Sequence, residues 1–406
     1  MRRFLLFPIL LPLAGCLSTE PPPPPAAYPP EEDAILQELA VFTEALYLAK
    51  NDHAEDVSFR DLLYGAIDGM MQSLDPYSSF LPPESYEDFK EEASGEFCGI
   101  GITVDFDDAG LRIIAPIDDS PAAKAGILPG DYILAIDGET VENESLGEVV
   151  KRMRGERGSK VELTILRADG TEKKFILTRD DIKIPSVKLE ETIRDGIGVM
   201  RISSFTANTP DEFADALARF RERGGRGFVL DLRDNPGGLL DAAVSVAEML
   251  LPRGSVIVSV KGRRIPEDEP SVYKAGACPE RDRRIPLAVL VNGHSASASE
   301  ILAGALQAHG RAAVFGVQTY GKASVQSVIP LESRSTCALR MTTGYYYTPA
   351  GACIHGEGIQ PDVNVPLEES VWRKLRQTRN RTGKDGKLRD PQRERAVEYL
   401  AGKLKG

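Results

Sequence analysis

The stretch FVLDLRDNPGG, residues 228–238, decides the fold class of this chain of 406 residues. It begins with an apolar run, Phe228–Leu232, and continues into a polar turn that ends in two glycines. A helical pattern over 239–251 follows at once. A buried strand that leads through a glycine turn into a helix is the repeating unit of α/β proteins. The stretch therefore predicts an α/β domain.

The same alternation of apolar strands and helices extends over 186–365, which we expect to form one domain. Its further strands are expected at Val199–Ile202, Ser255–Val260 and Leu287–Val291, and its further helices at 210–222 and 297–308. The segment before it, 95–182, has a different pattern, because short β-runs are separated by Gly, Asp and Pro turns. A single helix fits there, at Leu146–Met153. We therefore expect a second, β-rich domain inserted ahead of the α/β domain.

Three further segments flank these two domains. Apolar residues recur at spacings of three and four over 33–92, which predicts an N-terminal helical region. Residues 17–32 are rich in proline, which favours an extended, stiff linker. Residues 366–406 are basic on balance and weakly amphipathic, and we interpret them as a surface helix or tail.

The N-terminus has the pattern of an export signal. Arg2 and Arg3 precede an apolar run from Phe4 to Leu13, which is too short to span a bilayer as a helix. Residues 1–16 end in Leu-Ala-Gly-Cys, which resembles the lipobox of bacterial lipoproteins, so that Cys16 would be lipidated. Leu17 follows it instead of the aspartate that marks inner-membrane retention, which predicts a periplasmic protein anchored in the outer membrane. The alternative is an ordinary signal with a chance cysteine.

Composition narrows the function. The formal net charge is 49 − 61 = −12, and there is no phosphate-binding GxxxxGK[ST] motif, so nothing points to nucleic acid or nucleotides. The sequence has only four histidines and no HExxH motif. We therefore expect neither a metal site nor a cofactor.

Four cysteines remain after Cys16, and an exported protein is able to form disulfides. They are Cys98, Cys278, Cys337 and Cys353. Cys337 and Cys353 flank the turn-rich stretch 348–352 and are the expected pair. Two buried thiols are the alternative.

The β-rich segment resembles a PDZ domain of the bacterial protease type over the whole of 95–182. The resemblance rests on an ordered set of motifs: Gly99-Ile100-Gly101-Ile102, Ser120-Pro121-Ala122, Ala125-Gly126-Ile127, Pro129-Gly130-Asp131 and Ile136-Asp137-Gly138. It implies that backbone N–H groups at Gly99, Ile100, Gly101 and Ile102 bind the terminal carboxylate of a peptide, which adds to an open sheet edge. A purely structural PDZ domain that binds nothing is the alternative.

A candidate nucleophile lies in the stretch SASASE, residues 295–300. Ser297 is at the expected start of an Ala-rich helix, where unpaired backbone N–H groups and the helix dipole favour an oxyanion. The N–H of Ala298 is one candidate donor. A serine hydroxyl is a poor nucleophile and needs a base.

Several motifs together resemble the carboxyl-terminal processing peptidases, also called tail-specific proteases. They are the residues 233–238, 292–300, 319–326, 345–349 and 358–362, together with 74–78 and the PDZ-like segment, so that the resemblance covers roughly 34–365. It implies an α/β protease core with a layered fold of the crotonase or ClpP type, an inserted PDZ domain and an N-terminal helical region. It also implies a serine endopeptidase with no cofactor, which cleaves exported proteins selected by apolar C-terminal tails. A homodimer and an adaptor protein are left open.

The resemblance assigns the remaining site residues. The family's base is a lysine 25 residues after the serine, and 322 − 297 = 25 assigns Lys322. Gln326 is the family's third residue, and Gly237 or Gly238 completes the oxyanion hole with Ala298. A base must be neutral, so we expect burial to lower the pKa of Lys322. A strand would separate the Cα atoms of Lys322 and Gln326 by about 13 Å, so we expect 322–326 to be turned.

Other interpretations stay open at this point. His294, three residues before Ser297, is a candidate for assisting the serine in a variant of the mechanism. The alternative interpretation of His294 is a solvated turn residue. A catalytically silent PDZ adaptor or chaperone is the runner-up function, and the Ser297–Lys322–Gln326 set argues against it. A crotonase-type acyl-CoA enzyme would need neither a PDZ domain nor a serine nucleophile.

Overall fold

The computed structural model of the protein describes residues 32–107, 109–117, 119–142, 144–167, 169–190, 195–266, 270–276, 284–379 and 389–405. The predicted signal with Cys16, the proline run and Cys278 lie outside the described residues. The chain divides into two compact units, Met1–Met70 and Met71–Gly406, and each is considered by itself.

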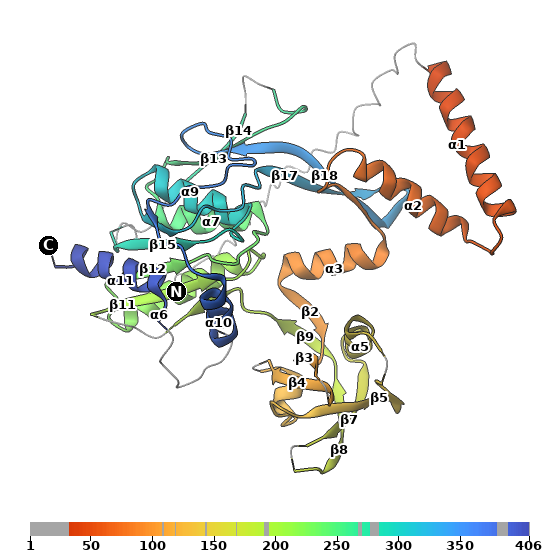
Figure 1. Cartoon of the computed structure of the whole chain (residues 1–406), viewed down its shortest axis with the longest axis horizontal. Helices are drawn as coiled ribbons and strands as arrows, with labels where there is room; N and C mark the ends of the chain where they lie inside the picture. The colour runs from red at the N-terminus through yellow and green to blue at the C-terminus, as the bar shows by residue number, and fades with distance from the viewer. Residues whose placement is uncertain are drawn as a thin grey trace, which may run out of the picture. The chain divides into compact units, whose positions relative to one another are not determined.

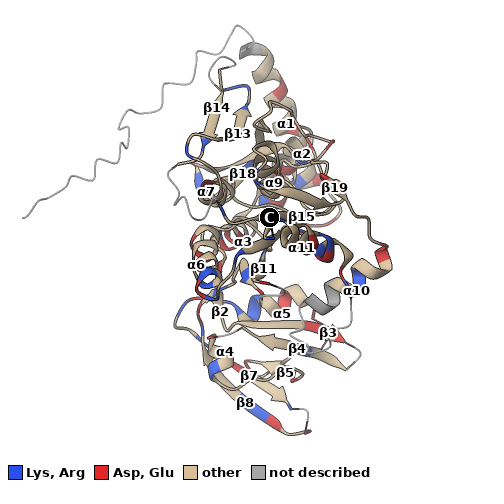
Figure 2. Ribbon diagram, turned by 90° about the vertical axis from the view of Figure 1, so that its left-hand side faces the viewer, with Lys and Arg blue, Asp and Glu red and all other residues tan. Residues whose placement is uncertain are grey.

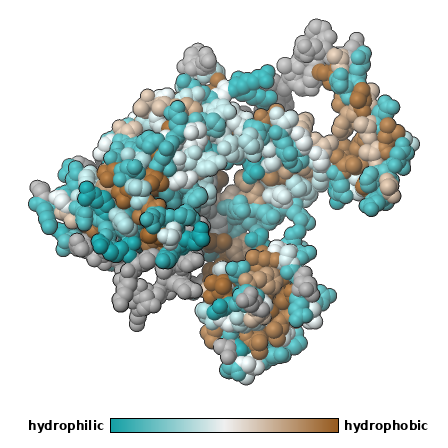
Figure 3. All heavy atoms as spheres, in the orientation of Figure 1, coloured by the Kyte–Doolittle hydropathy of each residue, from teal (hydrophilic) through white to brown (hydrophobic). Residues whose placement is uncertain are grey.

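The first unit is helical, as the apolar spacing predicts. It contains α1 (Glu32–Asp52) and the larger part of α2 (Phe59–Gln72). Apolar side chains on α1 are exposed, as the brown spheres on this helix in Figure 3 show. They are Ile35, Leu36, Leu39, Val41, Phe42, Tyr47 and Leu48.

A six-stranded sheet forms the centre of the second unit. Its order is β10 (Val187–Leu189), β11 (Ile197–Ile202), β12 (Gly227–Asp231), β15 (Leu287–Val291), β16 (Ala313–Gly316) and β19 (Val363–Asn364). β11 to β19 pair in parallel, and only β10 is antiparallel to its neighbour. Parallel strands need crossover connections, which contain α6, α7 and α9 between β11 and β16, whereas β17 and β18 lie between β16 and β19.

Both faces of this sheet are buried, and alternate residues of each strand point to opposite faces. Phe228 and Leu230 belong to a core shared with α6 (Thr209–Glu222), α7 (Leu240–Leu250) and α9 (Ala298–Ala308). Val229 belongs to a second core on the other face. Burial on both faces explains why these strands are continuous apolar runs in the sequence.

A second sheet covers the far side of the helices. It is built around the long strand β18 (Arg334–Tyr347), which pairs with β1 (Ser79–Leu81), β13 (Val256–Lys261) and β17 (Ser324–Leu331), while β14 (Ser271–Lys274) pairs with β13. Figure 1 shows α7 and α9 between the two sheets, and both helices contact β13. The core is therefore a layered α/β structure.

The PDZ-like segment has its own sheet and core. The strand order is β3 (Ile102–Asp107), β4 (Gly110–Pro116), β5 (Tyr132–Ile136), β7 (Lys160–Leu166) and β8 (Glu172–Thr178), with β6 (Glu139–Thr140) on β5. The two helices are α4 (Pro121–Lys124) and α5 (Leu146–Met153), and the latter has the bounds that the sequence predicts. β2 (Glu96–Gly99) pairs with β9 (Asp180–Lys183) where the chain enters and leaves this domain, just after α3 (Pro83–Ser94).

The C-terminal segment is more than a surface tail. It contains α10 (Glu369–Arg379) and α11 (Pro391–Lys403). α11 buries Ala396, Val397 and Leu400 in the core on the second face of the central sheet. This helix therefore completes the layering, although its sequence pattern is only weakly amphipathic.

The expected disulfide is wrong. Cys337 and Cys353 are both thiols in the structure. The backbone of Cys353 forms an isolated antiparallel β-bridge with Tyr347, the last residue of β18. Cys337 lies on the same extended strand, ten residues before Tyr347. Ten residues of strand span about 33 Å, and a disulfide requires Cα atoms within about 7 Å.

Two surveys of the described residues bear on function. No helix among them is both long and apolar enough to cross a membrane, and no group of His, Cys, Asp and Glu side chains is placed to hold a metal ion. Figure 2 shows basic and acidic residues interspersed along the ribbon.

Candidate active site

One cleft of about 900 Å³ in the second unit brings the predicted catalytic residues together. It is lined by Ser297, Lys322 and Gln326, and by the three proposed oxyanion residues Ala298, Gly237 and Gly238. These positions are far apart in the sequence, so their convergence is a property of the fold.

Ser297 is the residue before the first turn of α9, and its backbone is strained. Its φ is 54° and its ψ is −116°, a combination that costs a non-glycine residue free energy and is found where function requires it. The neighbouring serines have other roles, because both are fully buried. The Ser295 hydroxyl donates to the Leu232 carbonyl at 2.8 Å, and the Ser299 hydroxyl donates to the Asn235 carbonyl at 2.9 Å. Of the three serines, only Ser297 lines the cleft.

A buried carboxylate links the backbone of the candidate nucleophile to that of the candidate base. Glu300 is fully buried, and its Oε2 accepts from the N–H of Ser297 at 2.8 Å and from the N–H of Lys322 at 2.9 Å. Its Oε1 accepts from the Thr319 hydroxyl at 2.5 Å and from the Gly321 N–H at 2.7 Å. Four donors satisfy a charge that would otherwise be expensive to bury.

The glycine turn after β12 lies directly against Ser297. A Cβ on Gly237 would lie 2.8 Å from the Ser297 Cβ, and a Cβ on Gly238 would lie 2.1 Å from the Phe205 carbonyl oxygen. Both glycines also have positive φ, 108° and 135°. Only glycine therefore allows the backbone to approach the serine this closely.

The hydrogen bonds of this turn distinguish its two glycines. The N–H of Gly237 donates to Asn235 Oδ1 at 2.9 Å. For the N–H groups of Gly238 and Ala298, the described part of the chain provides no acceptor. Gly238 and Ala298 are therefore the two donors whose N–H groups are available to an oxyanion.

Lys322 is half-buried and lines the same cleft as Ser297. Burial first, and then the nearby Arg340 cation, hold the pKa of Lys322 below its usual range, against a smaller opposite effect of Asp75. Its Nζ lies over the Tyr77 ring, 4.7 Å from the centroid, and has no hydrogen bond or ion pair with any described side chain. A lowered pKa is the property that a lysine base requires.

Gln326 meets Lys322 at Tyr77, by a route that the sequence analysis did not expect. Its amide Nε2 donates to the Tyr77 carbonyl at 2.8 Å. The expected turn over 322–326 is wrong, because β17 begins at Ser324 and Gln326 is part of this strand. A register shift between Val325 and Gln326 marks a β-bulge, a feature that re-aims side chains next to active sites.

His294 does not support a histidine-assisted variant. The residue is exposed, it is not among the residues that line the cleft, and its backbone N–H donates to Asn292 Oδ1 at 3.1 Å. This is the geometry of a solvated turn residue.

The PDZ-like domain offers the features expected of a peptide site. β3 is the edge strand of its sheet, so one side of it is open to an added strand. The stretch Gly99–Ile102 precedes and begins this strand. At Gly101, φ is 72°, and a Cβ would lie 2.3 Å from the Ser120 Cβ, so this turn requires glycine.

The sequence analysis missed three residues that shape the site. Glu300 has the capping-box spacing S-x-x-E from Ser297, and this signal was available in the sequence. Asn235 anchors the glycine turn to distant parts of the chain, because its amide donates to the Ile202 carbonyl at 3.0 Å and its carbonyl accepts from the Ser299 hydroxyl at 2.9 Å. Beside the candidate base, the Tyr77 carbonyl accepts from the distant Gln326. No local spacing indicates those contacts.

Comparisons with known proteins decide the family. A carboxy-terminal-processing protease of Bartonella bacilliformis is 41% identical over 349 residues, which cover 83% of this chain and 78% of that protein. The chain belongs to the carboxy-terminal processing serine proteases. The sequence model described as Peptidase family S41 matches residues 196–365. A carboxyl-terminal-processing protease of Synechocystis sp. is 41% identical over 318 residues, with 76% of this chain and 72% of that protein covered.

The other parts of this family member also match known domains. A PDZ domain model matches residues 112–167, inside the predicted 95–182, and the N-terminal domain model of the activating protease CtpB matches 26–85. Among solved structures, the photosystem II D1 C-terminal processing protease is 30% identical with a TM-score of 0.46, covering 81% of this chain and 93% of that one. The predicted fold class, an α/β peptidase core with an inserted PDZ domain and N-terminal helices, is confirmed.

Proposed function

We propose that this serine protease cleaves peptide bonds with a Ser297–Lys322 dyad. Ser297 Oγ attacks the scissile carbonyl, and the neutral amine of Lys322 takes its proton and later gives it to the leaving amine. Gln326 and Tyr77 orient the lysine. The observation that supports this assignment best is that a strained serine at a helix start and a lysine of lowered pKa line one cleft.

The oxyanion of the tetrahedral intermediate is bound by the N–H groups of Ala298 and Gly238. The N–H of Gly237 already has an acceptor within its own turn, so its role is to allow close approach rather than to donate. The dipole of α9 adds to the stabilisation, because its positive end faces the same place.

Substrates are selected by their C-terminal tails through the PDZ domain. The tail adds as a strand to the open edge of β3, and the N–H groups around Gly99–Ile102 bind its carboxylate. An apolar last residue suits this mode of recognition. The cleft then acts on a more distant, unstructured segment of the same chain.

The direct test is to incubate the purified protein with an unstructured substrate that ends in apolar residues and to map the cuts. Matched substrates end in Asp-Asp or carry an amidated terminus. We expect cleavage of the apolar-tailed substrate to be fastest, and Ser297→Ala to reduce all cleavage to background. Equal rates for all tails would refute tail selection, and persistent cleavage by Ser297→Ala would refute the nucleophile.

The proposal extends to export and anchoring. The pattern of Arg2 and Arg3, the apolar run and Cys16 supports a lipoprotein of the periplasm that is held at the outer membrane. Mature protein should then incorporate palmitate and fractionate with outer membranes, and Cys16→Ser should abolish both. Equal labelling of the variant would refute the lipobox.

The proposal also includes a homodimer through α1. Leu36 is 63% exposed and Val41 is 62% exposed on this helix, and a second copy of the same helix is the partner that would bury such apolar side chains. Light scattering should give the mass of a dimer, and Leu36→Glu with Val41→Glu should give that of a monomer. A wild-type monomer at micromolar concentration would refute it.

A further inference from the structure

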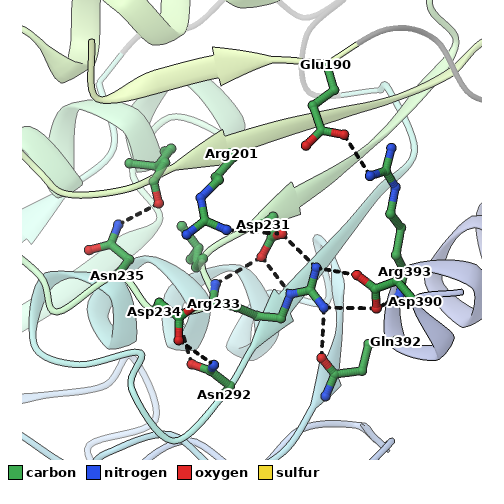
Figure 4. Close-up of polar contacts among 12 residues, drawn as sticks. Glu190, Arg201, Asp231, Arg233, Asp234, Asn235, Asn292, Asp390, Gln392 and Arg393 are labelled. Atoms are coloured by element: carbon green, nitrogen blue, oxygen red, sulfur yellow. Dashed lines mark hydrogen bonds and ion pairs between the residues drawn. The ribbon is translucent and has the colours of Figure 1, made fainter. Parts of the chain in front are cut away.

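The C-terminal segment reaches the active-site turn through one buried arginine. Arg233 is the second residue after β12 and is 1% exposed. Asp390, the N-cap residue of α11, and Gln392, in its first turn, come from beyond residue 365, where the peptidase match ends. Figure 4 shows both side chains pointing at the Arg233 guanidinium.

All five N–H groups of the guanidinium have an acceptor. Nε and Nη2 donate to the two carboxylate oxygens of Asp231 at 2.9 and 2.8 Å. Nη1 and Nη2 donate to the two oxygens of Asp390 at 3.0 and 2.8 Å. The remaining hydrogen of Nη1 goes to Gln392 Oε1 at 3.0 Å. Two bidentate pairs and one amide fix the orientation of a planar group that has only five donors.

The charges around Arg233 make its partners from α11 necessary. Burial alone would lower the pKa of Arg233, but Asp231 and then Asp390 outweigh this effect and raise it. Arg201 lies 3.7 Å from Asp231, so one aspartate faces two cations on this side. Asp390 supplies the second negative charge. Without it, a buried cation would lack its counter-charge, which is costly.

The residues after Arg233 carry this constraint to the catalytic turn. Asp234 and Asn292 exchange two hydrogen bonds of 3.0 Å. The Asn235 carbonyl accepts from the Ala296 N–H at 3.0 Å, and Asn235 Oδ1 accepts from the Gly237 N–H at 2.9 Å. Hydrogen bonds therefore fix Asp234 and Asn235, which connect Arg233 to the glycine turn that lies against Ser297.

We propose that Asp390 and Gln392 are positioning residues of the protease, which hold the oxyanion turn at Gly237 and Gly238 through Arg233. The inference rests on the proposed role of this turn in catalysis. It assigns to the C-terminal helix a catalytic consequence in addition to the packing of Ala396, Val397 and Leu400 on the central sheet.

The test compares two variants of the full-length protein. One changes the contact of Asp390 with Arg233, and the other changes the packing of α11 on the central sheet. Asp390→Asn keeps the shape and the N-cap, because asparagine caps helices as well as aspartate, but it turns an amide donor toward a guanidinium donor. Val397→Ala removes packing on the sheet and leaves every Arg233 contact in place. We expect Asp390→Asn to lower kcat by about 10- to 100-fold with KM changed less than about twofold. Val397→Ala should lower the midpoint of thermal unfolding and leave kcat unchanged where the protein is folded.

A second measurement reports on the oxyanion turn itself. A peptide aldehyde forms a tetrahedral adduct with the serine and needs the oxyanion donors, whereas an uncleaved peptide bound to Ser297→Ala does not. Asp390→Asn should weaken aldehyde inhibition by the same factor as it lowers kcat/KM. Introduced into Ser297→Ala, it should leave peptide affinity unchanged. Gln392→Leu should weaken aldehyde inhibition and lower kcat/KM by the same factor, which we expect to be a few-fold. If Asp390→Asn does not fold, Gln392→Leu is compared with Val397→Ala in its place.

Two results would overturn the inference: wild-type kcat in Asp390→Asn, or a loss of kcat in Val397→Ala that equals that of Asp390→Asn at equal loss of stability. Failure of the proposed function has a different signature, because Ser297→Ala would then retain cleavage. If Ser297→Ala is inactive and Asp390→Asn has wild-type kcat, only the inference about the C-terminal helix fails.

Discussion

The two sides of the catalytic cleft differ in how firmly their residues are held. Around Ser297, the candidate nucleophile, the buried hydroxyls of Ser295 and Ser299 donate to backbone carbonyls at and just after the end of the 228–232 run. Glu300 fixes the backbone of Ser297. On the base side, the Lys322 amine lies over Tyr77 without a hydrogen bond to any described side chain, and only its backbone is fixed. The structure therefore holds the turn that we propose binds the oxyanion in a fixed conformation and leaves the proposed base as the more adjustable part.

This difference has a physical reason. Oxyanion stabilisation depends on donors that need no reorganisation during the reaction, and a rigid turn provides them. A lysine base needs partial burial to lose its proton, and a strong acceptor beside it would keep it charged. Oxyanion binding therefore requires a rigid turn, and a lysine base requires an amine with few hydrogen-bond partners.

The strongest way to break the rigid side is Gly238→Ala. The new Cβ would lie 2.1 Å from the Phe205 carbonyl oxygen at a φ of 135°, so the turn must move and take a donor with it. We expect kcat to fall by about 10²- to 10³-fold, and the free energy of unfolding by about 3 kcal/mol. Gly293→Ala is the control, because its Cβ would meet nothing closer than 3.9 Å. Similar effects of both substitutions would contradict the special role of the turn.

Glu300→Gln tests the link between the two sides. The amide keeps the size of the carboxylate, but its NH₂ group replaces one of the two accepting oxygens. In one orientation it faces the N–H groups of Ser297 and Lys322, and in the other it faces the N–H of Gly321. We expect kcat to fall by about 10²-fold, because both catalytic residues shift. Steady-state kinetics and a denaturant titration measure the two effects. Full activity with reduced stability would make Glu300 a structural residue only.

Gln326→Ala is expected to have a smaller effect on kcat, about 10-fold, because it removes an orienting group and leaves the base in place. On the adjustable side, loss of one contact should change the rate more than the stability. A change in the free energy of unfolding without a change in kcat would show that the contact with Tyr77 serves the fold.

Arg340→Met should have the smallest effect on kcat at high pH, and it should shift the dependence of kcat on pH. Arg340 is the second cause of the lowered pKa of Lys322, after burial. Removing its charge raises the pKa of Lys322, so the rising limb of kcat against pH should shift to higher pH. Rates at a pH above both pKa values should converge. An unshifted limb would mean that another group controls it.

The sequence predicted best those parts of the fold that are buried on both faces. The strand Leu287–Val291 is fully buried and has the bounds expected from its apolar run. The amphipathic helix Leu146–Met153, which buries only Val149 and Met153, also has the expected bounds. β17 and β18 were missed, because only some of their residues are buried while others line the cleft or face solvent, so neither strand has a continuous apolar run.

Residues of the candidate site could be proposed from the sequence where one stretch of it contains the signal. Ser297 follows from a helix start, and Lys322 and Gln326 follow from the spacing of family motifs. The contacts of Gln326 with Tyr77 and of Arg233 with Asp390 join residues 249 and 157 positions apart. Such pairs become visible only when the chain is folded. The contact of Gln326 with Tyr77 replaces the expected turn over 322–326. The expected disulfide was wrong for a different reason, because the unrecognised strand β18 separates Cys337 from Cys353.

The most direct test of the account is the activity of Lys322→Arg beside that of Lys322→Ala, measured over a range of pH. Arginine keeps the charge and approximate size of lysine but stays protonated at any usable pH, so it cannot accept the serine proton. We predict that both variants are inactive at every pH, while wild-type kcat rises with pH through the lowered pKa of Lys322, because the neutral amine is the active form. Substantial cleavage by Lys322→Arg would contradict the account, because another group would then be the base.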